Sequence, residues 1–85
     1  MVFLPLKDVL ERVRGIEDVE EVVGALDFGQ QNEVRNTQES ILNNRTLCKT
    51  FGIDYSNPGE KGYVLLKKVS YVLVESHVQF SDICH

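Results

Sequence analysis

The sequence predicts an α+β fold, in which three or four helices pack on one face of a small sheet that has a C-terminal edge strand. Apolar residues recur at helical spacing over residues 6–13 and again over 65–73. Apolar and polar residues alternate over 78–83, which indicates a short strand. A chain of 85 residues has room for one domain with a thin core, so residues 1–85 are interpreted as a single domain.

The N-terminal region is predicted to be helical. The first apolar stripe falls at i, i+3, i+4 and i+7 and consists of Leu6, Val9, Leu10 and Val13. Pro5 suits the first turn of this helix, and Gly15 is expected to end it in a left-handed conformation. A second helical pattern begins at Ile16 and breaks at Gly24. Residues 24–28 are then either the end of that helix or a short strand, and the strand is favoured.

The middle of the chain is predicted to be a helix followed by an extended segment. Residues 32–43 carry a narrow apolar stripe, formed by Val34, Thr37, Ile41 and Leu42, and Asn43 and Asn44 suit its end. Residues 45–51 alternate between polar and apolar side chains, which favours an extended segment that Gly52 terminates.

The last third is predicted to be a long helix and a terminal strand. Asn57, Pro58 and Glu60 form a helix-start signal, in which Asn57 caps the helix and Glu60 completes a capping box. The many valines that follow suit a strand, but a strand over 63–74 would be about twice the usual length, so a helix is favoured. Residues 78–83 then form the edge strand.

Charge and composition exclude several classes of partner. Residues 1–30 carry a net charge of −4, whereas acidic and basic residues balance over 31–85. A nucleic acid is not expected as a partner, because binding to phosphates needs a basic surface. No apolar run is long enough to span a membrane, and residues 1–5 do not resemble a signal peptide. A cytoplasmic location is expected.

Neither a metal site nor a cofactor is predicted. Cys48 and Cys84 could pair in principle, but without a secretion signal they are expected to be free thiols. Together with His77 and His85 they include zinc-type ligands, but no pair of them has the regular spacing of a zinc site. Cys48 is expected to be a small buried apolar residue.

A family resemblance rests on an ordered series of segments. Residues 32–42 form a helix with an Ile-Leu end, Arg45 leads to Phe51-Gly52-Ile53-Asp54, and a second helix leads through Glu75-Ser76-His77-Val78 to a strand. This series resembles the small baseplate-wedge and sheath-initiator proteins of contractile phage tails and type VI secretion systems, historically labelled lysozyme-like. The resemblance covers residues 31–85 and leaves the helical segment 1–25 unassigned.

The sequence also departs from that family. The connector 43–50 is shorter than usual in the family and poorer in glycine and proline. A Glu-Pro-Arg corner of the family reads here as Glu75-Ser76-His77, so proline and arginine are lost. The further strands that normally follow in the family have no counterpart in this chain.

The resemblance implies a non-enzymatic structural protein of the tail or baseplate that takes part in virion assembly, located in the host cytoplasm or in the virion. Such a protein docks on partner subunits by pairing its edge strand, 78–83, with their strands, and works as a homo- or hetero-oligomer. The residues expected to contact partners are Phe51, Asp54, Tyr55, Glu75, His77, Val78, Phe80 and Ile83.

Two alternatives from other functional classes remain open. The first is a small regulatory adaptor that sequesters a cellular protein through its acidic N-terminal helices. The second is a minimal hydrolase that uses Glu75 and His77 as an acid–base pair. A glycosidase of the usual kind needs two facing carboxylates, and no second carboxylate is obviously placed to oppose Glu75.

Overall fold

The structure, a computed structural model, describes residues 3–84, and it is mostly helical. The described chain contains five α-helices, one 3-10 turn and two strands of two residues each. In chain order they are β1 (Leu4–Pro5), α1 (Leu6–Arg14), α2 (Val19–Gly24), α3 (Phe28–Leu42), α4 (Arg45–Phe51), α5 (Gly59–Glu75), η1 (Phe80–Asp82) and β2 (Ile83–Cys84). The predicted α+β fold is therefore wrong.

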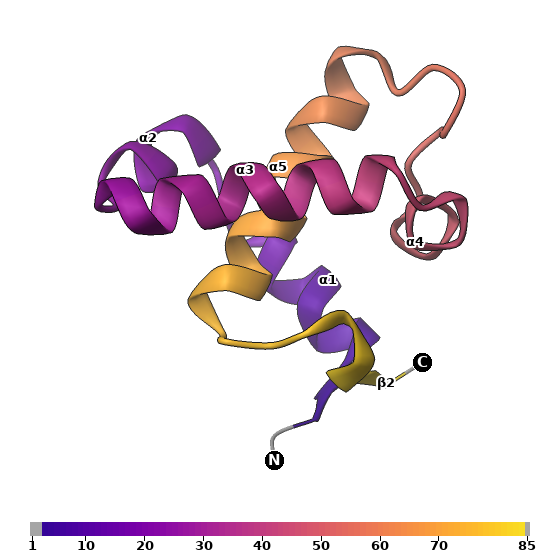
Figure 1. Cartoon of the computed structure of the whole chain (residues 1–85), viewed down its shortest axis with the longest axis horizontal. Coiled ribbons are helices and arrows are strands. Elements are labelled where there is room, and N and C mark those ends of the chain that lie inside the picture. The colour runs from indigo at the N-terminus through magenta and orange to yellow at the C-terminus, as the bar shows by residue number, and fades with distance from the viewer. Residues whose placement is uncertain (1–2, 85) are drawn as a thin grey trace.

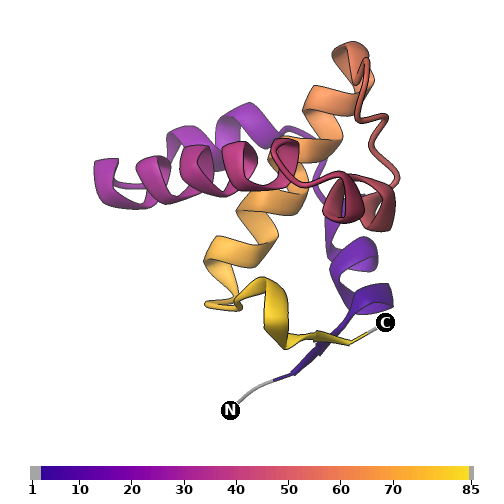
Figure 2. The same ribbon diagram turned by 45° about the vertical axis from the view of Figure 1, so that its right-hand side comes forward.

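Helix α5 is the centre of the molecule. Figures 1 and 2 show it running between α3, which crosses it, and α1, while α2 lies beside the first half of α3. It packs against α1, α2 and α3. Its buried residues are Leu66, Val69, Ser70, Val72 and Leu73. The hydroxyl of Ser70 is satisfied within the helix, because it donates to the carbonyl of Leu66 at 2.8 Å.

The region 24–28 is not a strand, because Asp27 starts a helix there. Its carboxylate accepts the backbone N–H of Gln30 at 2.8 Å, which caps the free end of α3. Helix α3 thus begins at Phe28 instead of residue 32. Of the predicted strand, Gly24 ends α2, Phe28 begins α3, and residues 25–27 form the short connection between them.

The segment 45–51 is helical instead of extended. The side chain of Asn44 accepts the N–H of Leu47 at 3.1 Å and so caps α4. Helix α4 directs Cys48 and Phe51 into the core, and these residues are one helical turn apart. The apparent alternation over these seven residues belongs to a helical pattern.

The C-terminal edge strand is also wrong over most of its predicted length. Residues 80–82 form the turn η1, in which the carboxylate of Asp82 accepts the N–H of Gln79 at 3.1 Å. Within the described part of this segment the strand β2 covers Ile83–Cys84, and it pairs in parallel with Leu4–Pro5 of the same chain. Figure 1 shows this pairing next to the start of α1.

Two helices lie where the sequence predicts them. Helix α1 covers Leu6–Arg14, and α5 covers the predicted apolar stripe. The end of α1 and the start of α5 differ from the prediction. Gly15 is right-handed, with φ −75°, and Asn57 makes no capping bond at the start of α5. In the part of the chain that the structure describes, none of the helices is long and apolar enough to cross a membrane.

Candidate partner-binding surfaces

Two of the eight residues expected to contact partners belong to the core. Phe51 is 3% exposed and Ile83 is 8% exposed, and both pack in the same buried cluster. Their side chains stabilise the fold and are not presented to a partner. The other six residues lie at three different places on the surface.

Asp54 and Tyr55 lie in the exposed loop between α4 and α5. The Asp54 carboxylate accepts the hydroxyl of Ser56 at 2.9 Å and the backbone N–H groups of Ser56 and Asn57 at 3.1 and 3.4 Å. These bonds, that of the Ser56 hydroxyl first, lower the pKa of Asp54. Tyr55 is 44% exposed, and the Arg45 guanidinium lies 5.2 Å from its ring centroid, within cation–π range.

His77, Val78 and Phe80 come together in one depression, which we call the C-terminal hollow. It has a volume of about 380 Å³. Its walls are formed by Glu33, Asn36, Thr37, Leu73, Val74, His77, Val78, Gln79 and Phe80. One wall therefore comes from α3, and the other comes from the end of α5 and the segment that follows it.

The hollow owes its shape to the way α5 ends. The N–H of Val78 donates to the carbonyl of Leu73 at 3.2 Å, and the N–H of His77 donates to that of Val74 at 3.2 Å. This pair of bonds is a Schellman motif, which needs a left-handed residue at the position of His77. His77 has φ 55° and is the one residue other than glycine with positive φ among those described. The turn brings Val78 back against the end of α5.

Glu75 lies on a different side of α5, in a second depression that we call the acidic groove. The groove has a volume of about 560 Å³ and runs between the end of α1, the start of α2 and the last turns of α5. It is lined by Arg12, Gly15, Ile16, Glu17, Asp18, Glu21, Val22, Tyr71, Val72, Glu75 and Ser76. Glu75 and His77 line separate depressions, so the structure does not bring them together in one site.

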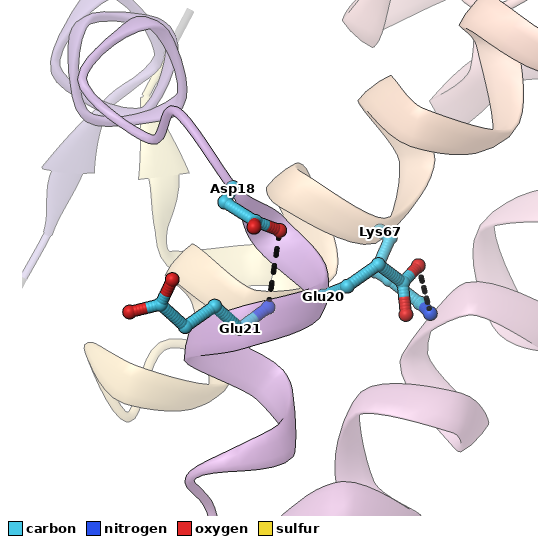
Figure 3. Close-up of polar contacts among 4 residues, drawn as sticks. All are labelled: Asp18, Glu20, Glu21 and Lys67. Carbon is cyan, nitrogen blue, oxygen red and sulfur yellow. Dashed lines mark hydrogen bonds and ion pairs between the residues drawn. The ribbon is translucent and has the colours of Figure 1, made fainter.

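The fixed position of α2 defines one wall of the acidic groove. Asp18 caps this short helix by accepting the N–H of Glu21 at 3.2 Å. Glu20 binds Lys67 of α5 at 2.8 Å, and this is the one ion pair among the described residues. Figure 3 shows the Glu20 side chain directed toward Lys67 and the Glu21 side chain extending on the other side of α2.

The groove also contains residues that the sequence did not single out for function, above all Val22 and Tyr71. Both are half-buried. Burial and the neighbouring Glu75 carboxylate raise the pKa of the Tyr71 hydroxyl. The excess of acidic residues over 1–30 was the available signal for the acidic side chains of the groove. The contribution of α5 to the groove lining follows from tertiary packing and has no local signature in the sequence.

Cys48 is a buried residue of the core. Its side chain is fully buried, and its Sγ donates to the carbonyl of Ile41 at 3.0 Å. Burial raises the pKa of this free thiol, which makes the reactive thiolate scarce. No cluster of three or more His, Cys, Asp or Glu side chains suited to a metal occurs within the described part of the chain.

Comparison with known proteins finds no family model, no curated protein and no solved structure that matches this chain. The resemblance to the baseplate-wedge proteins therefore stays a prediction that rests on the segments quoted for it.

Proposed function

We propose that this protein is a non-catalytic interaction module that docks on a partner protein through the C-terminal hollow. The observation that carries the proposal is the Schellman end of α5, where a strained His77 places Val78 and Phe80 around an open depression. Strained backbone persists only where the surrounding structure over-determines it, and it clusters at ligand-binding sites.

The chemistry of the hollow suits an apolar side chain of a partner. Leu73, Val74, Val78 and Phe80 offer apolar contact, while Asn36 and Gln79 offer amide groups for hydrogen bonds at the rim. An apolar anchor surrounded by polar groups is the usual composition of a protein–protein contact. Strand pairing through 78–83 is not proposed, because η1 occupies half of that segment and Ile83 already pairs with Leu4 of the same chain.

The family resemblance supplies the candidate partners, which are tail or baseplate subunits. We infer that a chain of this size acts there by joining neighbouring subunits and not by chemistry. The test is coexpression with the products of the neighbouring genes, followed by co-purification. Deleting residues 78–85 would be uninformative, because the deletion also removes the buried Ile83 and its pairing with β1.

Point variants separate docking from folding. Val78→Lys puts a charge in the hollow, and Asn36→Arg adds bulk at its exposed rim. We expect both variants to lose the partner. Val64→Lys is the matched control, because Val64 is 42% exposed on the first half of α5, outside the hollow. Unchanged co-purification of Asn36→Arg and Val78→Lys, with thermal unfolding intact, would contradict the proposal.

A further inference from the structure

The acidic groove combines an apolar floor with a charged rim. Ile16, Val22, Tyr71 and Val72 supply the floor. The rim carries four carboxylates, those of Glu17, Asp18, Glu21 and Glu75, and one guanidinium, that of Arg12, for a net charge of −3. A groove of this kind can desolvate an apolar side chain while its rim selects the sign of the surrounding charges.

The rim charges are available to a partner. Arg12 donates to the hydroxyl of Ser76 at 2.8 Å, and no rim carboxylate forms an ion pair among residues 3–83. The neighbouring Glu20 differs, because Lys67 neutralises it outside the groove (Figure 3). The ion pair thus holds α2 against α5 and leaves the charge of Glu21 exposed on the groove side.

We propose that the acidic groove binds a basic amphipathic helix of a partner protein. Apolar side chains of such a helix would contact Val22 and Tyr71, and its Lys or Arg side chains would face Glu17, Glu21 and Glu75. Laying the apolar face of a helix into a groove is a recurring mode of peptide recognition. The excess acidity of residues 1–30 attracts basic segments and repels acidic ones.

The groove is independent of the C-terminal hollow. Successive residues of a helix are turned by about 100°, so the arc that contains Tyr71, Val72 and Glu75 is centred on the opposite side of α5 from the arc of Leu73 and Val74. A partner in the groove would leave the hollow open. The protein would then join two partners across α5, and each surface can be disabled without the other.

The probe is a synthetic peptide of leucine and lysine, about four helical turns long, with its leucines on one stripe. Binding to the full chain is measured by isothermal titration, and a peptide with glutamate in place of lysine is the negative control. Glu17→Gln/Glu21→Gln should weaken binding about tenfold, as expected for the loss of two surface charge pairs. Glu11→Gln/Glu39→Gln is the matched control, because it removes equal charge from exposed positions outside the groove.

The outcomes divide clearly once thermal unfolding shows that each variant is folded. Weakening confined to the groove variant, together with weakening by Val22→Ser that persists at high salt, supports the proposal. Equal weakening by both pairs of variants would show attraction by net charge alone. Peptide binding that Val22→Ser leaves unchanged would show that the apolar floor does not contact the peptide. Either result overturns the proposal. Self-association of the protein that Glu17→Gln/Glu21→Gln abolishes would assign the groove to a second copy and overturn it too.

Discussion

The ends of α4 and α5 have the same backbone hydrogen bonds but different side chains. At the end of α4, the N–H of Ile53 donates to the carbonyl of Cys48 at 2.7 Å and that of Gly52 to Lys49 at 3.2 Å. The end of α5 repeats this pattern at Val78 and His77. Both turns need a left-handed residue, and the values of φ are 76° for Gly52 and 55° for His77.

The two ends serve different purposes. Glycine adopts the left-handed conformation without steric cost, and Ile53 after it is buried in the core. Histidine bears a cost of about 1 kcal/mol there, although it tolerates positive φ better than bulky or β-branched residues do. Val78 after it is only half-buried and lines a hollow. The first end is built for stability, whereas the second retains an unfavourable residue beside a surface depression.

The largest difference between the two ends should appear at the residue after the turn. Ile53→Ala is expected to lower the free energy of unfolding by about 3 kcal/mol, because it opens a cavity in the core. Val78→Ala removes fewer atoms from a half-buried position and should cost about 1 kcal/mol. Urea unfolding followed by circular dichroism measures both. Equal costs would mean that the two ends are equally buried in solution.

A smaller effect is expected at the left-handed residue of α4. A Cβ built on Gly52 meets no atom within 4 Å, so Gly52→Ala changes only the backbone preference. The variant should lose about 1 kcal/mol of stability, the typical cost of this conformation for a residue with a side chain. Urea unfolding again provides the measurement. A neutral substitution would show that this end of α4 is not left-handed in solution.

The reverse substitution at the end of α5 should be stabilising. His77→Gly relieves the left-handed strain, and we expect a gain of somewhat under 1 kcal/mol, because glycine also gives the unfolded chain more freedom. The midpoint of thermal unfolding should rise accordingly. His77→Ala keeps the strain and serves as the control, so a gain from alanine as large as that from glycine would place the cause in the imidazole and not in the backbone.

The sequence predicted the long helices and the short helix α2, but it missed α4 and the turn η1. Stripes in α1 and α5 extend over two turns or more, so the period is unambiguous. The segments 45–51 and 78–83 are too short to separate a period of two from a helical one. In 45–51 the capping residues at the two ends stabilise the helix. Asn44 and Gly52 flank α4 as start and stop signals, and these signals outweigh the alternation.

The candidate surfaces were predicted only in part, because contacts between distant segments have no local signal in the sequence. His77, Val78 and Phe80 are close in sequence, so their grouping could be anticipated. The opposite wall of the hollow, with Asn36 and Thr37, depends on α3 crossing α5. The positive φ of His77 also has no local signal, because histidine is not a usual residue at that position of a helix end.

The smallest effect is expected in the loop after Gly52, where the Asp54 carboxylate accepts three hydrogen bonds. These bonds lower the pKa of Asp54 in the folded state, so they add stability that is present above its unfolded pKa. That stability is lost as the pH falls through the lower, folded pKa. Asp54→Asn keeps an acceptor oxygen but removes the charge, and its unfolding free energy should converge on that of the original protein at acidic pH. A difference between the two proteins that does not change with pH would show that the effect is steric and not ionic.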